Sequence, residues 1–141
     1  MKKIFIVILN YNSEKETEEC LDSLLKIKTS GFLVNVVVID NSENKFDLDV
    51  IKYKKINIKK IDTLKNLGFS GGMNTGINHS LNEGADYVLV LNNDTVVAEN
   101  FIQELFNFSE KNSNAGIAAP KIYFAKGHEF HKDKYKDAEL G

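Results

Sequence analysis

Three clusters of polar residues each follow an apolar stretch of this sequence, and a glycine-rich segment adds a fourth feature with possible chemistry. The polar clusters are Asn10-Tyr11-Asn12, Asp40-Asn41-Ser42 and Asn92-Asn93-Asp94, and the glycine-rich segment spans residues 66–72. A carboxylate at the end of a buried strand can hold a hard divalent cation, which in turn binds phosphates. Backbone amides of a glycine-rich segment at a helix N-terminus bind anions. Together these residue types predict a pocket for a nucleoside diphosphate.

Each cluster taken alone also has a purely structural explanation. Asn and Asp favour the turns that follow strands, and Asn12 needs no role beyond helix entry. Gly68, Gly71 and Gly72 do not form a G-x-G-x-x-G pattern, and a lone glycine cluster is weak evidence for phosphate binding. Asp94 is harder to explain this way, because a carboxylate at a strand end is costly unless it is paired or solvated. The prediction therefore depends on the convergence of all four segments.

Short runs rich in β-branched residues alternate with longer amphipathic stretches, which is the pattern of parallel strands connected by helices. The first run, residues 4–9, is apolar throughout and indicates a strand buried on both faces. Ser13 and Glu16 predict a capping box at the start of the first helix. The expected strands cover residues 4–9, 33–39, 56–61, 87–91 and 116–120; the expected helices cover residues 14–28, 73–81 and 99–112; residues 41–60 are a largely polar connection.

This order of elements predicts a three-layer α/β/α domain with a mostly parallel sheet. In such open sheets the ligand site lies beyond the carboxyl ends of the strands, at the point where the strand order reverses. The three polar clusters and the loop at residues 68–72 are expected to share that edge.

Composition excludes several classes of protein. The chain has 141 residues, enough for one domain, and its formal net charge is −2 with every basic residue a lysine, which argues against a nucleic-acid-binding protein. Its single cysteine excludes an intrachain disulfide framework and fits a reducing cytoplasm. The longest apolar run is far shorter than the ~20 residues that span a bilayer.

Other side chains with chemical potential are expected to be structural. Cys20 lies on the apolar face of the first helix and is predicted to be an inert core thiol. His79 lies off the apolar stripe of its helix, at the surface. His128 and His131 have no third metal ligand nearby in the charged tail, so they are expected to be solvated. The phenylalanines of residues 101–108 are expected to pack on the sheet.

Four segments together resemble, in order and spacing, the family-2 glycosyltransferases, in particular the bacterial rhamnosyltransferase-like branch. The resemblance runs from about Ile4 to Ile122. It implies the A-type glycosyltransferase (GT-A) fold, a nucleotide-sugar donor, a divalent Mn or Mg ion and inverting transfer to an acceptor hydroxyl. The segments are ILNYNS (residues 8–13), VIDNS (38–42), NLGFSGGMNTG (66–76) and LVLNNDT (89–95).

The resemblance also implies roles for the matching residues. Asp40 would accept a hydrogen bond from the pyrimidine base of the donor, and Asp94, at the last position of the family's D-x-D motif, would bind the metal between the two phosphates. The remaining positions would line the donor site. These implied donor-binding residues are Asn10, Asn12, Asp40, Asn66, Gly68, Gly71, Gly72, Asn74, Asn92 and Asn93.

Two features depart from the family pattern. Asn92 stands where the family has the first Asp of D-x-D, so metal binding is expected to be weaker. The family's catalytic base, an Asp or Glu in a downstream acceptor-binding half, is expected beyond Gly141. We therefore expect residues 1–125 to be the N-terminal donor-binding portion of a C-terminally incomplete GT-A domain, inactive alone, and residues 126–141 to be a charged tail or the start of the acceptor half.

The expected function is transfer of a sugar from a nucleotide-diphosphate donor to a carbohydrate or lipid-linked glycan acceptor, in bacterial cell-surface polysaccharide synthesis. The expected location is the cytoplasm, with peripheral association at the inner face of the membrane left open.

Three alternative functions remain. A sugar-phosphate nucleotidyltransferase would need Lys or Arg in the glycine loop. A non-catalytic nucleotide-binding module is favoured by the missing base. A flavodoxin-like or response-regulator-like module would need carboxylates at positions 10 and 12.

Overall fold

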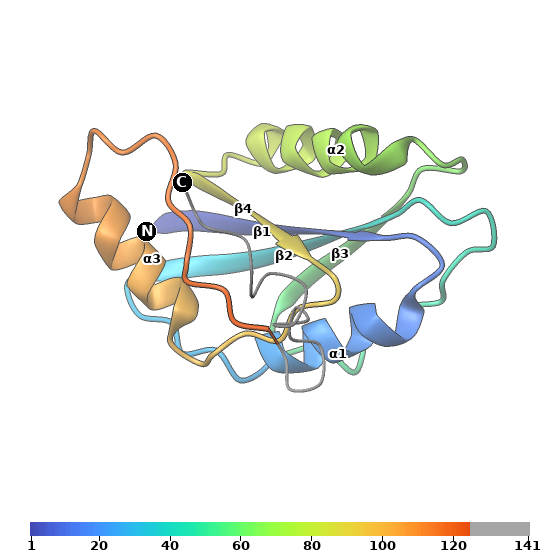
Figure 1. Ribbon diagram of the computed structural model, residues 1–141, viewed down its shortest axis with the longest axis horizontal. Helices are drawn as coiled ribbons and strands as arrows, with labels where there is room; N and C mark the ends of the chain where they lie inside the picture. Colours follow the sequence, from blue (N-terminus) through green and yellow to red (C-terminus); the bar gives the residue numbers. More distant parts are fainter. Residues whose placement is uncertain (125–141) are drawn as a thin grey trace, which may run out of the picture.

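Four parallel strands form one sheet in the order β3-β2-β1-β4, with helices against both of its faces (Figure 1). The structure is a computed structural model that describes residues 1–124. The elements in chain order are β1 (Lys2–Asn10), α1 (Glu14–Leu24), β2 (Phe32–Asp40), β3 (Asn57–Asp62), α2 (Gly68–Asn82), β4 (Tyr87–Asn92) and α3 (Phe101–Lys111). The predicted three-layer α/β class with a parallel sheet is confirmed.

Strand β1 is buried on both faces, as its continuous apolar run predicts. Its even-numbered residues Ile4, Ile6 and Ile8 pack into one hydrophobic cluster, and its odd-numbered residues Phe5 and Val7 pack into a second. Because successive side chains of a strand point to opposite faces, β1 connects the two cores of the molecule.

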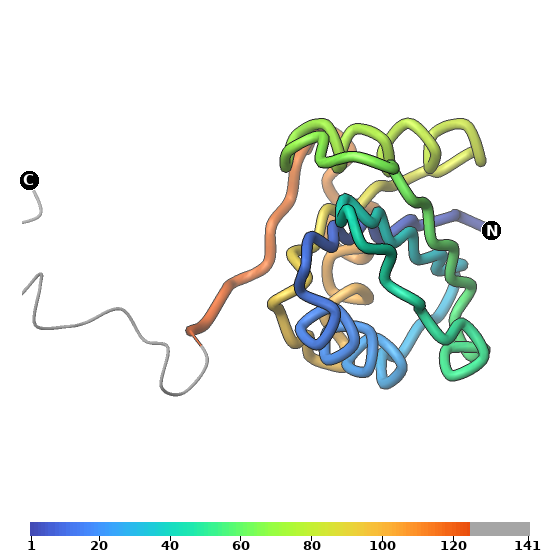
Figure 2. The backbone as a smooth tube through the Cα atoms, turned by 90° about the vertical axis from the view of Figure 1, so that its right-hand side faces the viewer, coloured from blue at the N-terminus to red at the C-terminus, as the bar shows by residue number. Residues whose placement is uncertain are grey.

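Helix α2 covers one face of the sheet, while α1 and α3 cover the other (Figure 1); the same layers are seen from the side in Figure 2. On the α2 face, Met73 packs with the odd-numbered residues of β1. On the opposite face, Leu21 of α1 and Ile102 of α3 pack with the even-numbered residues. The rings of Phe32 and Phe106 lie 4.6 Å apart and help to fix α3 against the sheet. The expected packing of the phenylalanine-rich helix is confirmed for Phe101 and Phe106 but is wrong for Phe108, which is 48% exposed.

The structure corrects three local predictions. Helix α1 ends at Leu24, whereas the apolar spacing predicts a helix to residue 28. Residues 68–72 are not a loop before a helix, because α2 already begins at Gly68. Residues 116–120 form no strand, and this segment is largely exposed, with Ile117 94% accessible; Pro120 also lacks the backbone N–H that a strand would need.

The order of strands reverses between β1 and β4. From β1 the chain first adds β2 and β3 on one side and then places β4 on the other side. In open parallel sheets such a reversal leaves a crevice at the carboxyl ends of the two strands. Among the described residues no helix is long and apolar enough to cross a membrane.

Candidate functional site

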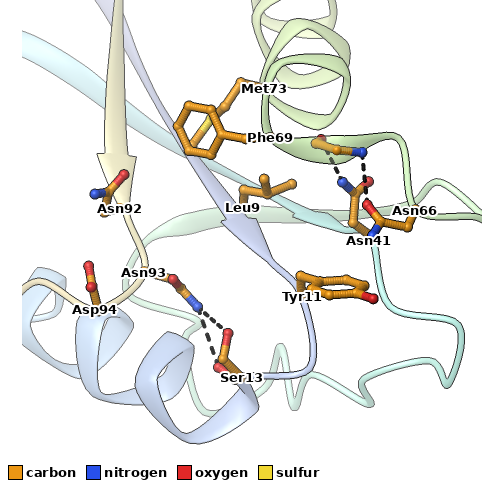
Figure 3. A pocket seen from close by; sticks show the side chains of 11 residues that line it. Leu9, Tyr11, Ser13, Asn41, Asn66, Phe69, Met73, Asn92, Asn93 and Asp94 are labelled. Carbon is orange, nitrogen blue, oxygen red and sulfur yellow. Dashed lines mark hydrogen bonds between the residues drawn. The ribbon is translucent and has the colours of Figure 1, made fainter.

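A cavity of about 380 Å³ lies at the carboxyl ends of β1 and β4, where the strand order reverses (Figure 3). It is bounded by the ends of both strands, by the N-cap residue of α1 and by the first residues of α2. The lining residues are Leu9, Tyr11, Ser13, Asn41, Asn66, Gly68, Phe69, Met73, Asn92, Asn93 and Asp94.

The start of α2 is fixed against the end of β2. Gly68 has φ +70°, a conformation that costs glycine little and other residues more, and nothing lies within 4 Å of the position a Cβ would take. Its N–H donates to Asn66 Oδ1 at 2.8 Å, and its carbonyl accepts from Asn41 Nδ2 at 2.9 Å. The Thr63 hydroxyl in turn donates to Asn41 Oδ1 at 2.9 Å. These bonds place the N-terminus of α2 at the rim of the cavity.

The start of α1 is fixed against the end of β4 on the other side of the cavity. Ser13 is the N-cap residue, but its side chain makes no capping hydrogen bond, so the predicted capping box with Glu16 does not form. The Ser13 hydroxyl instead accepts a 2.7 Å hydrogen bond from Asn93 Nδ2 and lies 3.4 Å from Asn10 Oδ1 (Figure 3). A residue placed to cap a helix therefore connects that helix to the Asn92-Asn93-Asp94 turn.

Asn10 and Asp40 lie behind the cavity and are almost completely buried. Asn10 Nδ2 donates to Asp40 Oδ1 at 3.0 Å, and the backbone N–H of Ser42 donates to the same oxygen at 3.1 Å. Asp40 Oδ2 accepts from the N–H of Phe46 at 2.8 Å and pairs with Lys60 Nζ at 2.9 Å. The carboxylate thus joins the ends of β1, β2 and β3.

Burial on its own raises the pKa of Asp40, because it penalises the charged form. The bonds from Lys60, Phe46, Ser42 and Asn10 outweigh that effect and lower the pKa to about 2. Lys60 also pairs with Asp62, and the two carboxylates raise its pKa above the usual value despite burial. Both partners of the buried pair are therefore charged at neutral pH.

Among residues 1–124, which the structure describes, Asp94 is the one charged side chain that lines the cavity. No lysine of this part of the chain lines it. The positive ends of the α1 and α2 dipoles face the cavity, since Ser13 and Gly68 both contribute to its wall. A ligand with two phosphates would meet favourable helix termini and one repelling carboxylate.

This donor set fits a hard divalent cation that is held partly by a ligand. Mg²⁺ in phosphate sites is commonly bound through one or two carboxylates, with substrate phosphates and water completing its octahedron. Asp94 supplies one such carboxylate, and the side-chain oxygens of Asn92 and Asn93 are nearby candidates on the same cavity wall. No group of three or more His, Cys, Asp or Glu side chains suited to a metal ion occurs within residues 1–124. The described residues by themselves therefore offer an incomplete set of ligands.

The structure brings together only part of the predicted site. Asn66, Gly68, Asn92, Asn93 and Asp94 line the cavity. The other predicted residues do not line it. Two of them, Asn10 and Asp40, form the buried support described above, and the others that lie outside the lining are Asn12, Gly71, Gly72 and Asn74. The predicted contacts of these residues with a donor stay predictions.

Sequence reasoning assigned no role to several lining residues. Tyr11 and Phe69 project half-exposed aromatic rings into the cavity wall, and Leu9 and Met73 form an apolar floor between them (Figure 3). Tyr11 and Phe69 both lie inside the quoted motifs, and the position of Tyr11 between two asparagines at the end of β1 was a further signal. No comparable signal marked Ser13, because its sequence context indicates a helix cap.

Cys20 is buried in the core, as predicted, and burial raises the pKa of its thiol to about 11. The thiol is therefore protonated at neutral pH and a poor nucleophile. His128 and His131 and the proposed tail of residues 126–141 lie outside the described residues.

Comparison with known proteins identifies a related family. The family model described as "Glycosyl transferase family 2" matches residues 5–139. Low-salt glycan biosynthesis hexosyltransferase Agl10 of Haloferax volcanii is 34% identical over 123 residues, which cover 86% of this chain and 37% of that protein. The dTDP-rhamnosyl transferase RfbF of Shigella flexneri is 32% identical over 120 residues, which cover 83% of this chain and 38% of that protein.

A solved structure agrees with the fold. The crystal structure of S. aureus TarS residues 1–349 in complex with UDP superposes with a TM-score of 0.68 at 22% identity, over 86% of this chain and 38% of that one. The chain thus spans less than two fifths of the length of each of these three proteins.

Proposed function

This chain belongs to glycosyl transferase family 2, and from that premise we propose that its cavity binds the nucleoside diphosphate of a sugar donor. The whole protein would transfer that sugar, with inversion, to the hydroxyl of a carbohydrate or lipid-linked glycan. The related proteins named as hexosyl and rhamnosyl transferases support this class of reaction. The GT-A architecture, with the cavity at the reversal of strand order, supports the place of the donor.

One observation carries the proposal: within residues 1–124, two helix N-termini and a single carboxylate face the same cavity, and no lysine lines it. The helix termini favour a diphosphate, whereas Asp94 repels one. A divalent cation on Asp94 converts that repulsion into attraction, and it would stabilise the negative charge that develops on the leaving diphosphate. We therefore propose Mn²⁺ or Mg²⁺ as the cofactor and Asp94 as its protein ligand.

The other lining residues suit the remaining parts of a nucleotide. The half-exposed rings of Tyr11 and Phe69 offer apolar faces for a base, since stacking on an aromatic ring is worth about 1–3 kcal/mol per base. Asn92 and Asn66 offer amide groups for ribose or sugar hydroxyls. Asn10 and Asp40 support this wall from behind, and direct contact of Asp40 with the base would require the base to displace one of its present partners.

The residues that line the cavity also argue against one alternative function. A nucleotidyltransferase that binds a triphosphate would need basic side chains around the phosphates, and none of the described residues that line this cavity is basic. We further propose a role in surface-polysaccharide synthesis in the cytoplasm, with the complete enzyme acting at the inner face of the membrane on a lipid-linked acceptor. The relative named for low-salt glycan biosynthesis supports a role in glycan synthesis.

Calorimetric titration of the chain with UDP, dTDP and GDP, each with Mn²⁺ and with a chelator, tests the donor site. We expect one nucleotide to bind at least tenfold more tightly with Mn²⁺. In D94N we expect the affinity with Mn²⁺ to fall to the chelator value, while the affinity in chelator stays equal or rises because a like charge has been removed.

The matched control is D47N, which removes an exposed carboxylate outside the cavity lining. D47N should bind like the wild type under both conditions. Equal affinity of wild type with and without Mn²⁺, or D94N that retains the metal dependence, would contradict the assignment of Asp94.

A further inference from the structure

One face of helix α1 lies along the segment that carries Asp94. Ser13, Thr17 and Cys20 are spaced so that they project from the same side of the helix, and each of them contacts the turn that follows β4. The Cys20 thiol lies 3.8 Å from the carbonyl oxygen of Asn92, and Thr95 Oγ1 donates to that same carbonyl at 2.6 Å. One turn further along, the Ser23 hydroxyl accepts from the N–H of Val97 at 3.2 Å.

Thr17 occupies the centre of this contact. Its side chain is fully buried, and its hydroxyl accepts a 3.0 Å hydrogen bond from Asn93 Nδ2. The proton of the same hydroxyl is within reach of Asn10 Oδ1 at 3.0 Å and of the Ser13 carbonyl at 2.9 Å. Thr17 therefore links the turn after β4 to Asn10, which is bonded to Asp40.

These bonds determine which way the Asn93 amide faces. Its nitrogen has two N–H groups, and the two nearest acceptors are the hydroxyls of Ser13, the N-cap residue of α1, and of Thr17 in the helix. Figure 3 shows the nitrogen directed toward Ser13. The carbonyl oxygen of the amide must then face away from α1. A threonine hydroxyl in a helix that bonded only to the carbonyl four residues earlier would not have this effect.

We propose that Thr17 is a positioning residue: its hydroxyl orients the Asn93 amide and holds the Asn92–Thr95 turn so that Asp94 can bind a cation together with a diphosphate. This inference rests on the proposed function, because it assumes that Asp94 is the cation ligand. Thr17 itself does not line the cavity, so it acts through Asn93 and Asp94.

The test compares two valine variants of the full 141-residue chain. T17V keeps the shape of the side chain and removes the hydroxyl. T75V is the matched control in α2, because the Thr75 hydroxyl also bonds to a carbonyl four residues earlier, that of Gly71 at 3.0 Å, but Thr75 lies outside the cavity lining. T17S retains the hydroxyl and tests rescue.

The readout is the ratio of the UDP dissociation constant in chelator to that with Mn²⁺, or the same ratio for whichever nucleotide the wild type binds. We expect T17V to lower this ratio about fivefold, the equivalent of one or two lost hydrogen bonds. T75V and T17S should stay within about twofold of wild type, and binding in chelator should change little in any variant. The Asn93 side-chain amide resonances should shift in T17V without ligand, and not in T75V.

The outcomes separate the two claims. A wild-type ratio near one would overturn the proposed function and this inference with it. A large wild-type ratio that T17V leaves unchanged, or that T75V lowers equally, would overturn the inference alone. If T17V does not fold, T17A replaces it; if neither variant folds while T75V does, the hydroxyl is structural and the positioning role is overturned.

Discussion

The carboxylate of Asp40 is almost completely buried, and its two oxygens bond to groups from two neighbouring strands, β1 and β3, and from the loop after β2. Its exposed fraction is 1%, and its partners are Asn10, Ser42, Phe46 and Lys60. A carboxylate can accept about four hydrogen bonds, so this one is saturated. At the scale of single residues, the molecule thus uses a buried charge to hold the strand ends that surround the cavity.

The charge of Asp40 should be visible in how the free energy of unfolding changes with pH. The pKa of Asp40 is lowered from 3.8 to about 2 in the folded protein. A lowered carboxyl pKa contributes stability that is present above the unfolded value and is lost as the pH falls through the folded value. We expect Asp40 to contribute about 2 kcal/mol at pH 6 and little of this below pH 2.

Urea unfolding of wild type and D40N between pH 6 and pH 2 measures this contribution. The difference between the two free energies of unfolding should be largest near pH 6 and shrink below pH 4. D47N, which removes an exposed carboxylate, serves as the control. A difference between wild type and D40N that is independent of pH would rule out a charged Asp40 as the source of the stability.

At the scale of elements, helix α2 approaches the sheet closely because two glycines face it. A Cβ on Gly76 would lie 2.3 Å from Val7 Cγ1, and one on Gly72 would lie 2.4 Å from Leu9 Cδ1 and 2.8 Å from Asn41 Nδ2. Val7 is in the core, whereas Leu9 and Asn41 line the cavity. The two glycines thus make the same kind of contact at different distances from the site.

Alanine substitutions at these glycines should separate stability from binding. Overpacking a core typically costs about 1–3 kcal/mol, and the better helix propensity of alanine offsets up to about 1 kcal/mol of it. We expect G76A to lower the free energy of unfolding by about 1–2 kcal/mol and to leave nucleotide affinity within about twofold. G72A should lower both, because Leu9 and Asn41 must move.

Chemical unfolding and calorimetric titration of each variant make the two measurements. N78A is the control, since Asn78 is exposed on the same helix and its replacement should not destabilise the fold. If G76A weakened nucleotide binding as much as G72A, the expected difference between the two glycines would be wrong. The contact of α2 with the sheet would then affect the cavity along its whole length.

At the scale of the whole molecule, the cavity lies between the two helical layers. Ser13 belongs to the α1 side of the sheet and Gly68 to the α2 side, and both contribute to the same cavity wall. A nucleotide that contacts both would bind the folded state and not the unfolded chain. Its binding energy is therefore added to the stability of the entire fold.

Thermal unfolding should show this linkage. At a nucleotide concentration 100 times the dissociation constant, the gain is about 2.7 kcal/mol, enough to raise Tm by several degrees in a protein of this size. We expect the rise with UDP and Mn²⁺ together, or with whichever nucleotide binds, and little of it with either component alone or in D94N. An equal rise with Mn²⁺ alone would indicate a cation site that does not depend on the nucleotide.

The positions of β1 and β4, the existence of α2, and the placement of Asn92, Asn93 and Asp94 at a strand end followed from the sequence alone, whereas the start of α2 at Gly68 did not. Apolar runs and their periodicity are local properties, and each strand end is marked by the residue at which its run stops. Membership of the glycosyltransferase family could also be predicted from the sequence, because four motifs occur in the order and spacing typical of that family. The sequence by itself therefore determines the class of chemistry.

Only the tertiary structure decided which distant side chains meet. Residues 41–60 are mostly polar in sequence, yet Phe46, Leu48 and Tyr53 are buried in the core beneath the sheet. Lys60 belongs to a weakly apolar strand, and its pairing with Asp40 depends on β2 and β3 lying side by side in register. Thr17 is a polar residue on the apolar face of a helix, and it finds its partner Asn93 seventy-six positions later in the chain. Hydrogen bonds of this kind depend on packing across layers, which no local pattern contains.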